Sequence, residues 1–502
     1  MNRLTARLTR PVGLAARMAG APPSERQRLH ERASLVVATL SGAPAPAGRR
    51  DLLTRLEQLL ESGDPAAVWL TLSVLEGRLA TPADVRRTVR AIRLDGVGAA
   101  LGATVARIAL SWLPQRDEAT VRVVQGAVLV DLDHTARTGL ATGIQRVARE
   151  TVRRWSRDHD VVLVGWDADY EQLRLLTPAQ ATTALTGEGA VESERTGDVV
   201  VPWESTYLLP ELSLESERNE RISAVAQYAR GRTGVIGFDC VPITTAETTA
   251  LGVSEAFARN LSAVRHMDRV SAISRAAAAE YGGWRTMLGS VGDTGPEIVA
   301  APLPAEARAT SEAELDAARE QLTVPGMPMV LCVGTHEPRK NHLALLHAAE
   351  LLWREGVEFN LVLIGGRSWN DERFQRALGE ARALNRPVDT PQGVTDAQLW
   401  AAYRLARCMV FPSLNEGYGL PVAEALACGT PVITSGYGSM AEIAADGGAL
   451  LVDARDDHDI AAALRTLLTD DAERDRLAAE ARNRPVRTWD DYARDVWDVL
   501  TG

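Results

Sequence analysis

The feature of this sequence that most constrains its fold is a repeated alternation of short apolar segments with longer segments of helical spacing. The alternation begins near Val121 and restarts near Pro325-Gly326. Its clearest member, Met329–Thr335 (MVLCVGT), is almost continuously apolar, as a parallel strand buried on both faces should be. Strands that alternate with helices form parallel sheets with helices on both faces. The sequence therefore predicts an α/β protein with two doubly wound, Rossmann-like domains in series.

The predicted strands fall into two sets. Those of the first domain are Ala127–Asp131, Val161–Trp166, Val199–Val201, Gly234–Asp239 and Arg269–Ser274. Those of the second domain are Met329–Thr335, Asn360–Gly366, Cys408–Ser413, Thr430–Ser435 and Ala449–Asp453. Because open parallel sheets bind their ligands at the carboxyl ends of the strands, two such domains facing each other would share one cleft.

Outside the two sheets, the sequence predicts helices at both ends of the chain. Residues 1–120 contain leucines at helical spacing, and Thr81-Pro82-Ala83-Asp84 has the residues of a capped helix start. This region carries no catalytic motif, and we expect an accessory role, with homo-oligomerisation through its helices as one candidate. The predicted divisions are 1–120 (helical extension), 121–324 and 325–485 (the two Rossmann-like domains) and 486–502 (a helix that crosses back to the 121–324 domain).

Charge and the N-terminal sequence restrict the partners and the location. The formal net charge of −11 argues against a nucleic-acid partner, whose phosphates require clustered Lys and Arg. Arg3, Arg7, Arg10 and Arg17 interrupt any apolar segment that a secretory signal would need, so a cytoplasmic protein is expected. The same four arginines would favour an anionic surface, which leaves peripheral contact with the inner membrane face as an alternative.

Two adjacent cations follow the strand Met329–Thr335, in the segment Glu337-Pro338-Arg339-Lys340-Asn341. Pro338 disfavours helix at the residue before it, which places Arg339 and Lys340 at a strand-to-helix junction on the ligand edge of the sheet. An arginine fork and a lysine point charge suit a diphosphate. Fixed cations there would stabilise the charge that grows on a leaving diphosphate. An isolated Arg-Lys pair is more often a solvated turn, so this interpretation depends on a second motif.

The second motif is the segment 411–432, FPSLNEGYGLPVAEALACGTPV. It predicts a strand that ends at Pro412, a glycine-rich turn through Gly417 and Gly419, and a helix opened by Pro421. The free amides of the turn and the positive end of the helix would form an anion site.

Two carboxylates lie eight residues apart in this motif. Glu416 is predicted on the turn and Glu424 in the first turn of the helix, where a carboxylate would also meet the helix dipole favourably. Both suit hydroxyl groups rather than phosphate, because a carboxylate accepts strong hydrogen bonds from sugar hydroxyls.

The run NEGYGLPVAEALACGTPV, with its Glu-x7-Glu spacing, resembles the donor-site signature of the retaining glycosyltransferases of family 4, which have the two-domain GT-B fold. The segment GTHEPRKNH resembles the diphosphate motif of the same family. A looser similarity in TGIQRV, FDCVP and SAISR extends the resemblance from about Val121 to the C-terminus. Residues 1–120 lie outside it.

The resemblance implies a role for each matching position in binding a nucleotide-diphosphate sugar. Arg339 and Lys340 would hold the diphosphate, Glu424 the ribose hydroxyls, and Glu416 would face the transferred sugar. The other implied donor-site positions are Val394 against the base, Gly417, Gly419, Leu420 and Pro421 around the phosphates, and Gly143 near the phosphates or the acceptor.

One position departs from the family pattern. Many relatives carry a histidine that helps to position the sugar where this chain has Phe238, which cannot form a hydrogen bond through its side chain. Asp239 is the neighbour that would inherit part of the role, and it joins Glu416, Arg339 and Lys340 as a candidate catalytic residue. The resemblance also implies that the new bond keeps the anomeric configuration of the donor, by a front-face route with a phosphate oxygen as base.

Neither a metal ion nor an organic cofactor is expected. Asp131-Leu132-Asp133 has the spacing of a cation-binding pair, but it ends the first predicted strand far from the donor motifs, and we interpret it as a strand-end turn. The turn from Thr138 to Gly143 lacks the G-x-G-x-x-G spacing of a dinucleotide site.

The sequence therefore predicts a retaining, metal-independent glycosyltransferase that moves a hexose-type sugar to a hydroxyl of a glycan, lipid-linked or small-molecule acceptor. Two alternatives use the same fold: a sugar-nucleotide epimerase, and a glycan phosphorylase, which needs a lysine for pyridoxal phosphate. A third is a non-catalytic scaffold that retains nucleotide-sugar binding. Turnover of a sugar donor would separate these functions.

Overall fold

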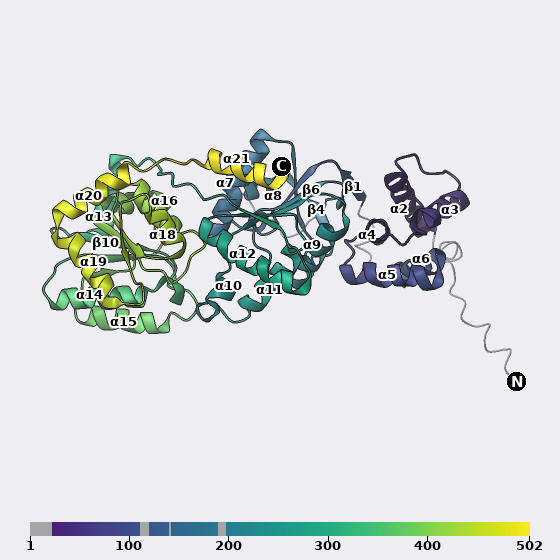
Figure 1. The fold of residues 1–502 in the computed structure, drawn as a ribbon. Helices are drawn as coiled ribbons and strands as arrows, with labels where there is room; N and C mark the ends of the chain where they lie inside the picture. The colour runs from purple at the N-terminus through teal and green to yellow at the C-terminus, as the bar shows by residue number, and fades with distance from the viewer. Residues whose placement is uncertain (1–22, 111–119, 140–141, 189–196) are drawn as a thin grey trace.

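The computed structural model describes residues 23–110, 120–139, 142–188 and 197–502. Its three parts lie in a row, with the N-terminal helices at one end, a nine-stranded domain in the middle and a six-stranded domain at the other end (Figure 1). This confirms the predicted α/β fold with a helical region before the two sheet domains. The N-terminal arginines from Arg3 to Arg17 and residues 140–141 of the predicted glycine-rich turn lie outside the described residues.

The described part of the N-terminal region forms helices that share a core with the middle domain. These are α2 (Pro23–Ser41), α3 (Arg49–Leu60), α4 (Pro65–Glu76), α5 (Pro82–Asp95) and α6 (Val97–Leu110). Helix α4 is apolar on nearly all sides and buried, as a helix enclosed by other elements should be. Its C-terminal turn is fixed to the middle domain, because Gln172 donates to the Gly77 carbonyl at 2.8 Å and Arg221 to the Leu79 carbonyl at 3.2 Å. The helices therefore cover one end of the sheet as part of a continuous core.

The sheet of the middle domain has the strand order β1-β5-β4-β3-β2-β6-β7-β8-β9. Its strands are β1 (Val121–Gln125), β2 (Val128–Asp131), β3 (Val161–Trp166), β4 (Leu173–Leu175), β5 (Val199–Trp203), β6 (Thr206–Leu209), β7 (Thr233–Gly237), β8 (Arg269–Ala272) and β9 (Glu297–Ala300). All neighbouring pairs are parallel except those made by β4. The five predicted strands correspond to β2, β3, β5, β7 and β8, whereas β1, β4, β6 and β9 were not predicted.

Helices connect these strands and cover the sheet. They are η3 (Thr135–Arg137), α7 (Gly143–Asp158), α8 (Pro178–Thr186), α9 (Ser216–Tyr228), α10 (Val241–Thr244), η4 (Ala246–Thr248), α11 (Val253–Val264), α12 (Arg275–Leu288) and η5 (Gly289–Val291). Helix α7 begins at the capping box of Thr142 and Gln145 and buries the apolar stripe that contains Val147, Val152 and Trp155.

The sheet of the C-terminal domain is parallel throughout, in the order β12-β11-β10-β13-β14-β15. Its strands are β10 (Met329–Val333), β11 (Asn360–Ile364), β12 (Val388–Asp389), β13 (Cys408–Phe411), β14 (Val432–Ser435) and β15 (Ala449–Val452). The five strands predicted from apolar runs are all present, and only the two-residue edge strand β12 was not predicted. The helices are α13 (Glu312–Leu322), η6 (Pro338–Lys340), α14 (His342–Arg354), α15 (Glu372–Ala383), α16 (Asp396–Leu405), α17 (Leu420–Ala427), α18 (Gly438–Ala444), α19 (Asp457–Thr469) and α20 (Asp471–Arg482).

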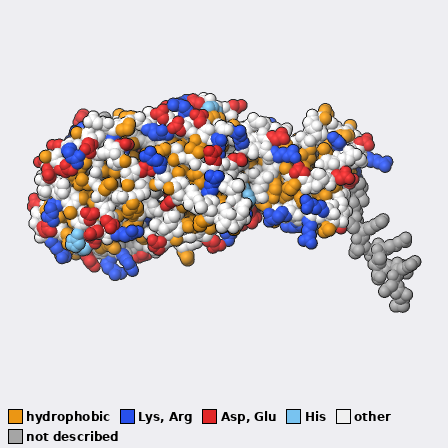
Figure 2. Space-filling view, viewed as in Figure 1, with side chains coloured by type: hydrophobic (Ala, Val, Ile, Leu, Met, Phe, Trp, Pro, Cys, Tyr) orange, Lys and Arg blue, Asp and Glu red, His pale blue; other side chains and the backbone are white. Residues whose placement is uncertain are grey.

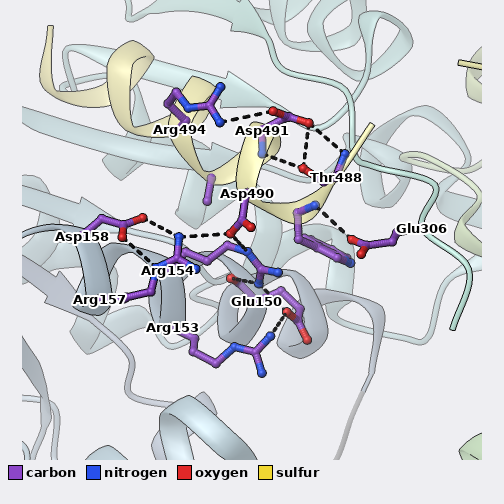
Figure 3. A network of polar contacts seen from close by, with 12 residues as sticks. Glu150, Arg153, Arg154, Arg157, Asp158, Glu306, Thr488, Asp490, Asp491 and Arg494 are labelled. Carbon is purple, nitrogen blue, oxygen red and sulfur yellow. Dashed lines mark hydrogen bonds and ion pairs between the residues drawn. The ribbon is translucent and has the colours of Figure 1, made fainter. Parts of the chain in front are cut away.

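The last helix, α21 (Trp489–Thr501), returns from the C-terminal domain and lies along α7 of the middle domain (Figure 1). The indole of Trp155 donates to the Ala493 carbonyl at 2.9 Å, and its ring meets that of Trp497 edge to face. Asp490 accepts from Arg154 at 2.7 Å and from Arg157 at 3.1 Å (Figure 3). These contacts tie the end of the chain across the two sheet domains. Within the described ranges, no helix combines the length and apolarity needed to cross a membrane.

Candidate functional site

The segment that follows β10 places two cations at the edge of the C-terminal sheet. Glu337 is extended, as the proline after it requires, and Arg339 and Lys340 lie on the short helix η6. Asn341 adopts a left-handed conformation and donates from its amide to the carbonyls of Pro412 at 3.2 Å and Ala454 at 2.6 Å. These two bonds fix the cationic segment against the ends of the neighbouring strands.

Both cations converge on Glu416, which belongs to the turn after β13. The ammonium of Lys340 lies 2.6 Å from Oε1 of Glu416, and Arg339 lies 2.6 Å from Oε2. Ser413 also donates its hydroxyl to Oε1, at 2.7 Å. Burial alone would raise the pKa of Glu416, but the charges of Lys340 and Arg339 lower it to about 2. The two motifs, 76 residues apart in sequence, therefore form one charged cluster.

Asp239 reaches this cluster from the middle domain. It lies against Gly417: a Cβ atom there would be 2.5 Å from the Phe238 carbonyl and 2.8 Å from a carboxylate oxygen of Asp239. Only glycine fits at this approach. The hydroxyl of Ser274 donates to the Gly417 carbonyl at 2.6 Å. Burial raises the pKa of Asp239 to about 6, although Arg339 nearby opposes the shift.

The structure corrects the expected position of Glu424. Helix α17 begins at Leu420, after Gly419 with φ +104°, so Glu424 lies beyond the first turn and does not cap the helix. It is 6% exposed and is held by side chains: Tyr403 donates to Oε2 at 2.8 Å, and Arg146 of α7 donates to Oε1. The second carboxylate of the motif thus joins the two sheet domains.

The starts of α7 and α17 also meet at this point. A Cβ atom on Gly143 would lie 3.9 Å from the Leu420 side chain, and Pro421 follows in the first turn of α17. Two helix N-termini that converge provide a positive potential suited to an anionic ligand. Val394 precedes the Thr395 cap of α16 and is partly buried. Within the described residues, Val394 forms no hydrogen bond with the charged cluster.

Phe238, which stands where the sequence resemblance implies a histidine, is 6% exposed and belongs to the apolar core that includes Ile236 and Ala272. The middle domain thus brings the carboxylate of Asp239 and the hydroxyl of Ser274 against Gly417 of the glycine turn.

The aspartates that resemble a metal-binding pair are occupied by protein groups. Asp131 is fully buried and accepts hydrogen bonds from Arg218 at 3.0 Å, from the Trp166 indole at 2.6 Å and from Tyr207. Asp133 accepts from the Trp166 amide at 2.8 Å and from Arg137. The pair supports the end of β2. Among the residues that the structure describes, no group of three or more His, Cys, Asp or Glu side chains is arranged to hold a metal ion.

Several residues of the site were not among those predicted. Arg146, Tyr403 and Ser274 each contact a segment that is distant in sequence, and Ser413 does so through its bond to the Arg339 carbonyl at 3.0 Å, so no local pattern assigns them these contacts. One available signal was overlooked: Lys340 is the only lysine among 502 residues, in a chain that uses arginine at every other long cationic position. A position that keeps lysine against this bias requires a compact ammonium group.

Comparison with known proteins agrees with this geometry. Residues 316–484 match the family model of the glycosyl transferases group 1. Over 365 residues the chain is 27% identical to the serotype-specific mannosyltransferase WbdA of Escherichia coli, a match that covers 68% of this chain and 42% of the relative. It is 36% identical over 203 residues to a D-inositol 3-phosphate glycosyltransferase of Xylanimonas cellulosilytica, covering 39% of this chain and 47% of the relative.

A solved structure supports the fold. Anabaena Alr3699/HepE, in complex with UDP and glucose, aligns with 75% of this chain and all of its own, with a TM-score of 0.54 and 12% identity. The chain spans less than half the length of the curated relatives named above. Residues 316–484 thus resemble the group 1 glycosyl transferases, and the two sheet domains of the chain have the GT-B architecture.

Proposed function

We propose that this chain transfers a sugar from a nucleotide-diphosphate donor to a hydroxyl of an acceptor, as a retaining glycosyltransferase of family 4 that needs no metal. The observation that carries the proposal is the convergence of Arg339 and Lys340 on Glu416 inside a group 1 domain. Two fixed cations at the end of a parallel strand are a site for a diphosphate, and the carboxylate between them is a site for sugar hydroxyls.

The charged cluster explains how such a reaction would be assisted. Negative charge grows on the donor diphosphate as its bond to the sugar breaks, and Arg339 and Lys340 would stabilise that charge in the transition state. These two side chains supply the positive charge that a bound metal provides in other transferases. Glu416, ionised at any physiological pH, would accept hydrogen bonds from the sugar, and Glu424 from the ribose.

Retention without a covalent sugar–enzyme intermediate requires that the acceptor hydroxyl attack from the face that the phosphate leaves. We propose that a phosphate oxygen takes the proton of the acceptor, because both oxygens of Glu416 are engaged by cations and a hydroxyl. A double displacement would need a carboxylate free to attack the anomeric carbon. Asp239, near the glycine turn, would orient the sugar.

The names of the relatives suggest the chemical class of the substrate. WbdA is described as a mannosyltransferase, and the Anabaena structure holds UDP and glucose. We propose a mannosyl or closely related hexosyl donor and a growing glycan as acceptor.

The alternative functions face specific obstacles. A glycan phosphorylase would need a lysine for pyridoxal phosphate, and the single lysine, Lys340, is 13% exposed and ion-paired to Glu416. An epimerase would turn over the donor without any acceptor. A scaffold would bind the nucleotide without turnover.

The first test is calorimetric binding of UDP, GDP, dTDP and CDP to the wild type, to Lys340→Ala and to the control Arg354→Ala, which alters an exposed arginine of α14. We expect one nucleotide to bind, Lys340→Ala to lose it, and the control to keep it. Turnover of the matching sugar nucleotide, with proton NMR of the anomeric signal, then tests transfer and retention. If no nucleotide binds to the wild type, the proposed donor site is wrong.

A location at a membrane surface is a separate proposal. Arg86, Arg87, Arg90 and Arg93 are exposed along one side of α5, and Figure 2 shows basic side chains gathered at that edge of the helical region. Such a stripe would attract anionic lipids. Co-sedimentation with anionic and with neutral vesicles tests this, since a salt-sensitive preference for the anionic vesicles is expected. Homo-oligomerisation through the same helices stays a prediction, to be checked by light scattering.

A further inference from the structure

A cavity of about 540 Å³ lies beside the cationic segment, at the carboxyl ends of β10 and β11. The starts of α14 and α15 form its floor, and the η4 segment of the middle domain reaches it through Glu247. The indole of Trp369, which donates to the Thr248 carbonyl at 3.4 Å, joins the two domains next to it. Its volume falls within the range of roughly 300–1,000 Å³ that is usual for small-molecule sites.

Two buried histidines belong to the wall of this cavity, and three of their four ring nitrogens have no hydrogen-bond partner in the described residues. His336 and His342 are each 3% exposed. In the described residues, neither ring nitrogen of His342 has a partner, and neither does Nε2 of His336. Nδ1 of His336 lies 3.5 Å from the Gln375 amide, at the outer limit of a hydrogen bond. Because native proteins pair nearly all buried polar groups, three orphaned ring nitrogens in the wall of one cavity indicate a partner from outside the chain, which would reach these buried atoms when the rings turn toward the cavity.

Charge in the cavity selects the kind of partner. Burial lowers the pKa of His342 to about 3 and also lowers that of His336, so both rings are neutral at physiological pH. A neutral imidazole offers one donor and one acceptor, which matches a hydroxyl group. An anion would meet the carboxylates of Glu247, Glu337, Asp371 and Glu372, which outnumber the one arginine of the lining, Arg373. A cation would find Glu337 and Asp371 already paired to arginines.

The remaining wall favours a sugar over other neutral ligands. The ring of Phe374, which is 5% exposed, packs against both histidines at centroid distances of 4.8 and 5.4 Å and makes this part of the wall apolar. Carbohydrate sites combine such a surface with groups that both donate and accept hydrogen bonds. Glu337 connects the cavity to the donor cluster, because its Oε1 lies 2.5 Å from Arg339.

We infer that this cavity is a saccharide subsite that binds a hexose unit of the acceptor glycan, away from the reacting hydroxyl, through His336 and His342. Its role in binding the acceptor rests on the proposed function. Its ability to bind a saccharide is argued from the residues of the cavity and does not depend on that function. Since both domains contribute to its wall, its occupancy would favour the arrangement in which the middle and C-terminal domains touch.

The test is NMR of the full chain labelled with ¹⁵N at histidine, whose eight rings give few signals. The probes are mannobiose, maltose, cellobiose and N,N′-diacetylchitobiose, each titrated with and without the nucleotide that binds the wild type. We expect at least one disaccharide to shift the signals of His336 and His342. His347, exposed on the same helix α14 and paired to Asp457, is the internal control and should not move.

Matched variants separate this site from others. His342→Leu and His336→Leu should weaken disaccharide binding about tenfold, the loss of one to two hydrogen bonds, while nucleotide affinity and the signals of the other histidines stay unchanged. His347→Leu should change neither. If a leucine variant fails to fold in a thermal unfolding scan, His342→Gln, which keeps a donor and an acceptor, should retain binding.

Two outcomes overturn the inference: no disaccharide shifts the two ring signals, or the leucine variants bind disaccharides as tightly as the wild type. In the first case the cavity holds only water. Nucleotide binding in the same samples tests the donor site independently. If the protein binds a disaccharide at this cavity but no nucleotide, the proposed function is contradicted while the saccharide site is supported.

Discussion

The ammonium of Lys340 lies 2.6 Å from the carboxylate of Glu416, and this pair joins the only lysine of the chain to the first glutamate of the glycine-rich turn. Without a ligand the carboxylate offsets the charge of the lysine. A donor diphosphate entering here would share the lysine with Glu416, so the cluster can receive an anion without leaving a buried cation unpaired.

Replacing this lysine tests whether its charge acts on the transition state. Lys340→Met should lower kcat about 10²–10³-fold, the usual cost of losing one group that stabilises developing charge. Lys340→Arg should recover only part of this activity. The lysine stem runs close over Gly334, where a Cβ atom would lie 3.5 Å from it, and a wider guanidinium fits poorly there. Steady-state kinetics with the donor identified by calorimetry measures both. A Lys340→Met enzyme with unchanged kcat would contradict the assigned role.

Glu424 should contribute to donor binding more than to catalysis. Glu424→Gln should raise the KM for the donor by about tenfold or more at similar kcat, because a hydrogen bond to a charged acceptor contributes about 1.5–3 kcal/mol. Tyr403→Phe is the control: it removes one hydrogen bond to the same carboxylate and keeps its charge and its contact with Arg146. A fall in kcat alone would place Glu424 at the reacting bond.

The dependence of stability on pH should reveal the raised pKa of Asp239. Its pKa in the folded protein is about 6, against 3.8 as the ordinary value, so the folded state binds the proton more tightly. Stability should therefore fall as pH rises from about 4 to 6, by on the order of 2–3 kcal/mol. Asp239→Asn should be more stable than the wild type at pH 8 and equal to it near pH 4, as measured by urea unfolding.

The matched control for this titration is Glu416, whose pKa is shifted in the opposite direction to about 2. Its ion pairs stabilise the protein above pH 4.5 and are lost only as pH falls from there toward 2. Between pH 5 and 8 the two carboxylates are thus distinguishable. If Asp239→Asn leaves the pH profile of stability unchanged, the carboxylate is already ionised at pH 5.

The aspartates after β2 should prove structural. Arg218→Met would leave Asp131 and Glu211 buried without their shared cation and should destabilise the protein by about 3–5 kcal/mol. Arg259→Met, at an exposed arginine of α11, should cost less than about 1 kcal/mol. Urea unfolding compares the two. A stability or turnover that depends on added Mg²⁺ or Mn²⁺ would contradict the assignment of these aspartates to the fold.

We expect that a buried hydroxyl of helix α21 can be removed without loss of stability. Tyr492 is fully buried, and its hydroxyl finds no partner in the described parts of the chain. Tyr492→Phe should leave the free energy of unfolding unchanged or raise it by up to about 1 kcal/mol. Trp155→Phe on the facing helix removes the bond to the Ala493 carbonyl and the contact with Trp497, and should destabilise by about 1–3 kcal/mol. A destabilised Tyr492→Phe would show that a water molecule satisfies the hydroxyl.

The sequence alone determined the elements whose signals are local. Nearly continuous apolar runs located β10, β11, β13, β14 and β15, because a strand buried on both faces is built mainly from apolar residues. The same logic found β2, β3, β5, β7 and β8. It missed short strands such as β4, which has only three residues and pairs antiparallel with β3. Three residues are too few to show an apolar run or an alternating pattern.

The tertiary structure alone decided which of the motif residues meet. Local sequence placed Arg339, Lys340 and Glu416 at strand ends, but only the parallel packing of β10 beside β13 brings their charges within 2.6 Å. In the structure Glu424 lies beyond the first turn of its helix. Its partner, Arg146, stands 278 residues earlier in the chain. Capping and apolar periodicity act over a few residues and are written in the sequence, whereas the contact of two domains depends on the shape of both, and no spacing along the chain encodes it.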